Sequence, residues 1–221
     1  MDLAEQIALV KKCGDNIKLI KNPSEKVQLA AVKSENEKEG AFKFIKNPSE
    51  KVQIAAVNRW GEDIQYIKNP SEKVQLAAVK SKNYYKKPLN WIKNPTEKVQ
   101  IAAVTIDGYN FLSINIENPS EKVKLAAVKT KNSPIPIHYI KNPSEKVQLI
   151  VMKRDPSEFR YIKNPTEKVK LAAVQRNPNI ILEIDNPSEK LIKAAEIAKI
   201  NPIPYDDLIR YYSDSEEENN G

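Results

Sequence analysis

Side chains that could carry out catalysis are few in this sequence and stand apart from one another. There is one histidine, His138, and one cysteine, Cys13. Neither is accompanied by the second histidine or paired cysteine that metal binding or nucleophilic catalysis requires. The five glycines lie at positions 14, 40, 61, 108 and 221, so they form no phosphate-binding loop. We therefore expect a protein that is not an enzyme and that uses no metal ion or cofactor.

Lysine is the residue type whose spacing suggests a chemical role, because it recurs in two regular rows. The first, which we call the cap row, follows a glutamate in each copy of a repeated sequence and comprises Lys26, Lys51, Lys73, Lys98, Lys122, Lys146, Lys168 and Lys190. The second, which we call the corner row, precedes most copies and comprises Lys21, Lys46, Lys68, Lys93, Lys141 and Lys163. Either row could be a solvated face with glutamate–lysine pairs between repeats, or a basic groove for phosphates or an acidic protein surface.

Aromatic residues accompany the corner row in most repeats, at Phe44, Tyr66, Trp91, Tyr139 and Tyr161. Aromatic side chains interleaved with lysines can stack on bases or hold a peptide. The alternative is that these rings only pack along the edge of the repeats. The pattern therefore leaves both a protein and a nucleic acid open as ligands.

The charge distribution favours an anionic partner. Residues 1–205 carry 35 basic and 23 acidic side chains, a net charge of +12, whereas residues 206–221 carry one basic and six acidic side chains. An asymmetry of this size suggests that the body of the protein binds an anionic surface. The acidic tail either competes for that surface or increases solubility.

Both lysine rows follow from one sequence that the chain repeats eight times. The first copy is Asn22–Val32, and the others begin at Asn47, Asn69, Asn94, Asn118, Asn142, Asn164 and Asn186. The starts are 22, 24 or 25 residues apart, and a period of this size is typical of a solenoid. Residues 1–20 resemble a degenerate copy, as expected where one face of a terminal repeat meets water.

Each copy begins with residues that favour a helix start. We expect Asn22 at the N-cap and Pro23 at the first helical position. Glu25 then lies three residues after the cap, where it would complete a capping box. The sequence thus predicts that each helix begins directly after its asparagine.

The apolar residues of each copy predict how its helix is buried. At about 100° per residue, Val27, Ala30 and Ala31 fall on one side of the helix. Leu29 and Val32 fall on nearly the opposite side. A helix with two apolar sides must be sandwiched, so we expect the helices of adjacent copies to pack on both sides of it.

A shorter second half of each copy carries two apolar residues three apart, such as Phe42 and Ile45. This spacing predicts one or two turns of α- or 3-10 helix, and Asp155-Pro156-Ser157-Glu158 would cap one such helix. In the alternation of a longer and a shorter helix, the chain resembles HEAT-like repeats and especially leucine-rich variant repeats. Its repeat also resembles uncharacterised repeat proteins of phages, giant viruses and low-GC bacteria. Such families bind diverse partners, so the resemblance implies architecture without a particular function.

The sequence therefore predicts an all-α fold, a right-handed solenoid of about eight two-helix repeats of 22–25 residues with a degenerate N-terminal unit. We expect the solenoid at 1–200, with the degenerate unit at 1–20 and a capping unit at 186–200. A C-terminal extension at 201–212 and a disordered acidic tail at 213–221 would follow. The single cysteine and the lack of a signal peptide or long apolar segment indicate the cytoplasm, that of the host cell if a phage or virus encodes the chain.

Repeats longer than 22 residues suggest a binding ridge. We place their extra residues between the two helices, around 81–87, 106–111 and 129–135, in three consecutive repeats. Insertions on one edge of a solenoid often mark its binding face, although random loop variation is the alternative. The predicted partner-binding residues of this ridge are Lys80, Lys82, Tyr84, Tyr85, Lys86, Lys87, Trp91, Tyr109, Phe111, Lys129 and Lys131.

These patterns predict a non-enzymatic protein-binding scaffold or inhibitor, which docks a partner with an acidic surface through the basic, aromatic edge of the solenoid. A phage-encoded antagonist of a host defence factor is one specific form of this hypothesis. The alternative is a nucleic-acid-binding protein that uses the lysine and aromatic rows. We expect no membrane partner.

Overall fold

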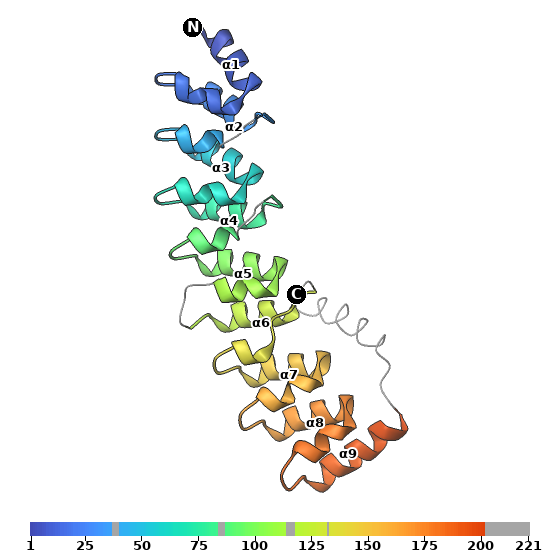
Figure 1. Cartoon of the computed structure of the whole chain (residues 1–221). Coiled ribbons are helices and arrows are strands. Elements are labelled where there is room, and N and C mark those ends of the chain that lie inside the picture. The colour runs from blue at the N-terminus through green and yellow to red at the C-terminus, as the bar shows by residue number, and fades with distance from the viewer. Residues whose placement is uncertain (37–39, 84–86, 114–117, 132, 202–221) are drawn as a thin grey trace, which may run out of the picture. The chain divides into compact units, whose positions relative to one another are not determined.

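The computed structural model of the protein describes residues 1–36, 40–83, 87–113, 118–131 and 133–201. Within these residues α-helices alternate with short 3-10 helices, and no strand occurs (Figure 1). The α-helices are α1 (Leu3–Lys12), α2 (Glu25–Val32), α3 (Glu50–Arg59), α4 (Glu72–Lys80), α5 (Glu97–Ile106), α6 (Glu121–Lys129), α7 (Glu145–Arg154), α8 (Glu167–Arg176) and α9 (Glu189–Ile200). The 3-10 helices are η1 (Gly14–Leu19), η2 (Ala41–Phe44), η3 (Gly61–Tyr66), η4 (Pro88–Trp91), η5 (Gly108–Ser113), η6 (Ile137–Tyr139), η7 (Pro156–Tyr161) and η8 (Pro178–Glu183). The alternation confirms the predicted all-α solenoid of two-helix repeats.

The chain divides into two compact units, Met1–Val123 and Lys124–Gly221. In the first unit the α-helices pack in sequence, α1 on α2, α2 on α3, α3 on α4 and α4 on α5. The 3-10 helices η1 to η5 pack in the same order. In the second unit α7, α8 and α9 pack in sequence, as do η6, η7 and η8. Each unit therefore stacks its repeats with one layer of α-helices and one layer of 3-10 helices, as predicted for helices that cannot bury their apolar surface alone.

The core of each repeat lies on one broad face of its α-helix. Val27, Ala31 and Val32 are at most 3% exposed, and they fall within an arc of about 140° on the helix. Leu29 and Ala30 lie about 60° beyond the two ends of this arc, where they are half-buried against the core. The buried residues thus lie on both predicted sides of the helix, Val27 and Ala31 on one and Val32 on the other, and the two sides join into one wide arc. The predicted packing between helices on both sides is confirmed.

The predicted helix start was wrong. Each helix begins at its glutamate, and the serine or threonine before it is the N-cap, as in α3, where the Ser49 hydroxyl accepts from the amide of Val52. In five of the described copies the asparagine instead occupies the left-handed region, with φ of 53° at Asn22 and 49° at Asn47. Both asparagine and serine cap helices well, but asparagine also tolerates positive φ. The sharp turn therefore uses the asparagine and leaves the serine as the cap.

The glutamate at each helix start contacts the next repeat and does not close a capping box. The carboxylate of Glu72 accepts a hydrogen bond of 2.7 Å from the hydroxyl of Thr96, the N-cap of the following helix. The same hydroxyl accepts from the amide of Val99. Equivalent bonds join Ser49 to Glu25, Ser71 to Glu50, Thr166 to Glu145 and Ser188 to Glu167. Each cap is thereby fixed to the repeat before it.

A glutamine holds the turn between repeats. The side-chain amide of Gln28 donates to the carbonyl oxygen of Pro23 at 3.0 Å. The same bond recurs at Gln53, Gln75, Gln100 and Gln148, each with the proline five residues earlier. These bonds occupy a carbonyl group that the tight turn leaves outside the helix, so they stabilise the turn.

Lengthened loops pack against the preceding repeat through glycine. The amide of Gly61 donates to the carbonyl oxygen of Asn83 at 3.0 Å, and Gly14 donates to Asn36 at 2.8 Å. A Cβ atom at Gly61 would lie 2.7 Å from the carbonyl oxygen of Ala78, so the close approach requires glycine. The loops at these two places therefore help to join consecutive repeats.

The insertion predicted at 106–111 was placed wrongly. α5 ends at Ile106 and η5 begins at Gly108, the same spacing as between Arg59 and Gly61 in a 22-residue repeat. The two extra residues of this repeat therefore follow Ser113, at positions outside the described residues. The insertions predicted around 81–87 and 129–135 do fall between an α-helix and its 3-10 helix.

Both ends of the described chain are helical. The degenerate unit at 1–20 contains α1 and η1, and α1 begins with a capping box between Asp2 and Glu5. The capping unit at 186–200 contains α9. The predicted acidic tail at 213–221, and the extension at 201–212 apart from Asn201, lie outside the described residues. No helix in the described ranges has the length and apolar character needed to cross a membrane.

Candidate binding surface

Each unit has two edges, which differ in how the chain connects its helices (Figure 1). At the corner edge a 3-10 helix leads into the next α-helix through a tight turn such as Lys21–Ser24. At the joint edge an α-helix leads into the 3-10 helix of its own repeat. Because the layers alternate along the chain, the corners gather on one side of the unit and the joints on the other (Figure 1).

Glutamates neutralise part of the cap row. Lys51, Lys98, Lys122 and Lys168 lie 3.4 to 3.7 Å from a carboxylate oxygen of the preceding repeat, namely that of Glu25, Glu72, Glu97 and Glu145. A hydrogen bond from the Thr96 hydroxyl and the neighbouring Lys98 hold the pKa of Glu72 below its ordinary value of 4.5. These lysines therefore belong to the bonds between repeats, which favours the solvated-face alternative for the cap row.

The corner row is different, because its lysines have no acidic partner in the described part of the chain. All six corner-row side chains are exposed. The ion pairs found among the described residues include none of them. Each follows the end of a 3-10 helix and precedes the asparagine of the corner. The corner edge therefore carries positive charge that the fold does not use.

Grooves separate successive corners. In the first unit a groove of about 640 Å³ is lined by Lys21, Gln28, Phe44 and Lys46, among other residues. In the second unit a groove of about 460 Å³ is lined at the equivalent positions by Lys141, Gln148, Tyr161 and Lys163. Two lysines, one aromatic ring and the corner glutamine thus recur as one constellation in both units.

Aromatic rings lie beside the corner lysines and keep much of their surface exposed. Tyr66, Tyr139 and Tyr161 are 45 to 52% exposed. His138, the single histidine, lies with its ring centroid 4.1 Å from that of Tyr139 and 5.0 Å from that of Tyr161. Exposed rings of this kind can contact a ligand directly, whereas half-buried Trp91 also serves the packing of its repeat.

Phe44 shows how the lysines and rings combine. The ammonium groups of Lys18 and Lys43 lie 5.2 and 5.0 Å from the centroid of its ring, within the range of cation–π contact. Neither lysine was part of the predicted rows. Lys18 precedes Lys21 by three residues, and Lys43 precedes Lys46 by three residues. This spacing was the sequence signal that could have identified Lys18 and Lys43, because it returns to the same side of a 3-10 helix.

The predicted ridge is only partly a free surface. Lys80, Lys82, Lys129 and Lys131 are exposed, and Tyr109 is 39% exposed. Tyr84, Tyr85 and Lys86 lie outside the described residues. The first unit contains the ridge residues up to Phe111, and the second unit contains Lys129 and Lys131.

Two ridge residues, Lys87 and Phe111, have contacts that stabilise the fold. The ammonium of Lys87 pairs with the carboxylate of Asp107 at 3.0 Å, and that carboxylate also accepts from the amide of Tyr109. Phe111 is 7% exposed and belongs to the core. The structure therefore brings Lys87 and Tyr109 together around Asp107. Binding of a partner by the ridge stays a prediction.

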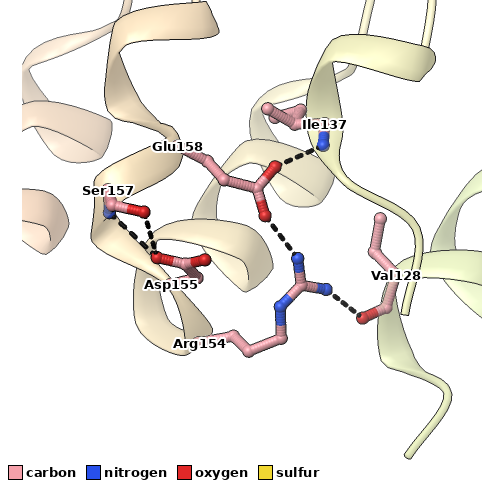
Figure 2. A network of polar contacts seen from close by, with 6 residues as sticks. All are labelled: Val128, Ile137, Arg154, Asp155, Ser157 and Glu158. Atoms are coloured by element: carbon pink, nitrogen blue, oxygen red, sulfur yellow. Dashed lines mark hydrogen bonds and ion pairs between the residues drawn. The ribbon is translucent and has the colours of Figure 1, made fainter. Parts of the chain in front are cut away.

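Charges at the joint edge of the second unit form a buried network, as Figure 2 shows. Arg154 donates to the carbonyl oxygen of Val128 at 3.0 Å and to the carboxylate of Glu158 at 2.6 Å. Glu158, which is 7% exposed, also accepts from the amide of Ile137. The predicted cap at Asp155 is confirmed, because its carboxylate accepts from the amide of Ser157. The sequence signalled this cap but not the partners of Arg154 and Glu158.

No group of three or more His, Cys, Asp and Glu side chains that could hold a metal ion is found within the described ranges. Cys13 is a half-buried free thiol. Comparisons of the chain with protein-family models, with curated proteins and with solved structures find no match. The chemistry of the surface is therefore the basis for assigning a function.

Proposed function

We propose that the protein is a non-enzymatic binding protein, and that the corner edge docks an acidic surface of a partner protein. The contrast between the two lysine rows supports this proposal most strongly. Among the described residues, four cap-row lysines form ion pairs that join repeats, whereas all six corner-row lysines are exposed and have no acidic partner. Uncompensated charge in a row attracts an anionic partner and raises its rate of association.

The grooves and rings add contact area to this charge. Aromatic side chains at the centre of an interface contribute much of its binding energy. Phe44 and Tyr161 line the two equivalent grooves, each between two corner-row lysines. A partner can thus bury a ring and pair its carboxylates with the flanking lysines at the same place. The exposed lysines of the ridge provide a further basic surface on each unit, Lys80 and Lys82 on the first and Lys129 and Lys131 on the second.

A nucleic-acid ligand is the second candidate, and the exposed tyrosines favour it. Side chains such as Tyr66, Tyr139 and Tyr161 could stack on bases while neighbouring lysines contact phosphates. The resemblance to HEAT-like and leucine-rich variant repeats is compatible with a protein ligand and with a nucleic-acid ligand. A role as an inhibitor that covers its target is also compatible with both. We place this function in the cytoplasm on the basis of the cysteine content.

The test uses two variants that remove the same charge from the first unit. One replaces the corner lysines, K46Q/K68Q/K93Q, and the other replaces paired cap-row lysines, K51Q/K98Q/K122Q. Binding of labelled poly-L-glutamate to the full chain is measured by fluorescence anisotropy, with an oligo-dT of equal charge as the competing ligand class. We expect the corner variant to bind poly-L-glutamate at least about tenfold more weakly than the wild type, and the cap variant to stay within about twofold.

Equal losses in the two variants would show that only net charge matters and would contradict the proposal. Tighter binding of oligo-dT than of poly-L-glutamate, with a steep dependence on salt, would favour the nucleic-acid function.

A further inference from the structure

We propose that the corner edge of the first unit binds a polypeptide in the polyproline II conformation that carries a carboxylate at every third residue. This inference rests on the proposed function and specifies the ligand. It follows from three features of the corner edge: the spacing of its lysines, the position of its aromatic rings and the number of successive corners.

The spacing of the repeats selects the conformation of the ligand. Each repeat places one corner-row lysine on the edge, and α2 to α5 pack directly on one another. Packed helices lie about 8–10 Å apart, so successive corner lysines recur at roughly this interval. A polyproline II helix has three residues per turn and rises about 9.3 Å per turn, so every third side chain lies on the same face.

Other backbone conformations do not match this interval. In a β-strand, side chains on one face recur about every 6.8 Å, and the third residue points to the opposite face. In an α-helix, side chains on one face recur about every 5.4 Å, or about every 10.5 Å when only each seventh residue is counted, and both intervals lie outside the expected 8–10 Å. In a ligand with either conformation, some carboxylates would lie within reach of a corner-row lysine and others would not. The polyproline II helix pairs one carboxylate with each lysine.

The aromatic rings occupy the positions that such a ligand requires. Phe44 lines the groove between Lys21 and Lys46, so a ring lies between two successive charges. Proline-rich segments in this conformation dock into grooves lined by aromatic side chains. The ammonium of Lys18, which also lines this groove, lies 5.2 Å from the centroid of the Phe44 ring. Prolines between the acidic residues would therefore contact the rings.

The number of corners sets the length of the ligand. The first unit provides four successive corner lysines, at Lys21, Lys46, Lys68 and Lys93. In the next repeat Glu117 replaces the lysine of the sequence pattern, so the row is interrupted there. Four carboxylates at every third position span about ten residues of a polyproline II helix. The second unit, with Lys141 and Lys163, offers a shorter version of the same surface.

The experiment compares two labelled peptides of identical composition on the full chain at low salt. The first consists of four Glu-Pro-Pro triplets, which places a carboxylate at every third residue. The second carries the same four glutamates and eight prolines in the order Glu-Pro-Glu-Pro-Pro-Pro, repeated twice. Both peptides adopt the polyproline II conformation, so they differ only in the spacing of charge.

We expect the triplet peptide to bind at least about tenfold more tightly than the rearranged peptide. K46Q/K68Q/K93Q should abolish this preference, and K51Q/K98Q/K122Q should retain it. If both peptides bind equally and the corner variant loses both, the spacing inference is overturned while the proposed function stands. If the corner variant loses neither peptide, both proposals fail. Tighter binding of an oligo-dT with four phosphates than of the triplet peptide would also overturn the inference.

Discussion

At the joint edge and in the cap row, charged side chains hold consecutive repeats together, whereas the corner-row lysines face solvent. Lys87 pairs with Asp107 of the next repeat, and Arg154 and Glu158 bond to Val128 and Ile137 of the preceding repeat. The corner-row lysines carry the same charge at similar frequency, but among the described residues they have no acidic partner. This difference shows that the regular recurrence of a charged residue in the sequence does not identify its role in the structure. The groups that lie within reach decide whether it stabilises the fold or remains available for a ligand.

The largest effect is expected from the buried carboxylate of the joint edge. Glu158→Ala removes the carboxylate that pairs with the guanidinium of Arg154 and leaves the amide of Ile137 without its acceptor, so it should lower the free energy of unfolding by about 3–5 kcal/mol. Urea unfolding measures the loss. The double variant Arg154→Leu/Glu158→Leu should cost less than the sum of the two single replacements, because it removes both charges. A loss below about 1 kcal/mol for Glu158→Ala would mean that this network does not join the repeats.

Gly61→Ala should have the next largest effect, because it inserts a methyl group where the joint is closest. The new Cβ would lie 2.7 Å from the carbonyl oxygen of Ala78 and from Cγ of Pro88. We expect a loss of about 1–3 kcal/mol in thermal or urea unfolding. A neutral or stabilising result, as is usual for a glycine in open space, would show that the loop does not pack on the preceding repeat.

The hydroxyl cap between repeats should contribute less. Thr96→Val removes both the acceptor for the amide of Val99 and the donor to Glu72, so it should cost about 1 kcal/mol. Thr105→Val is the matched control, because the Thr105 hydroxyl donates to the carbonyl of Ile101 within its own helix. Equal unfolding midpoints for the two variants would argue against a cap that joins repeats.

The pH dependence of this contact has a defined sign. Because the pKa of Glu72 is lowered in the folded state, its charged form stabilises the fold above the ordinary value of 4.5. This contribution is lost as the pH falls through the lowered pKa, since the protonated group no longer favours the folded state. The stability advantage of wild type over Glu72→Gln should therefore shrink on acidification below pH 4.5. Urea midpoints that keep the same difference at lower pH would contradict this account.

The smallest effect on stability is expected at the corner edge. K46Q/K68Q/K93Q should change the free energy of unfolding by less than about 0.5 kcal/mol, because these exposed side chains form no ion pair with any described residue. Thermal unfolding of this variant beside Glu158→Ala gives the direct contrast between the two edges. A large destabilisation would mean that the corner lysines have a structural role.

The repeat period was enough to predict the fold, because apolar residues such as Val27 and Ala31 recur at helical spacing in every copy. It could not decide between Asn22 and Ser24 as the cap, since both residue types suit that position and only the backbone angle separates them. The role of Glu72 was missed for a related reason. Its partner Thr96 lies 24 residues away, and this contact depends on how the repeats stack.

The candidate site shows the same limit. Both lysine rows share one period, so the sequence could not separate Lys51, which pairs with Glu25, from Lys46, which has no acidic partner in the described ranges. The ridge was chosen from loop length, and length does not show that Lys87 faces Asp107 or that Phe111 is buried. In each case the missing information is the neighbour that stacking brings within reach.

The most direct test of the corner edge is the affinity of the triplet Glu-Pro-Pro peptide for the two matched variants, measured by fluorescence anisotropy at one salt concentration. The account predicts at least about tenfold weaker binding for K46Q/K68Q/K93Q and a change within about twofold for K51Q/K98Q/K122Q. Equal affinities of the two variants would contradict the assignment of the corner row as the binding surface.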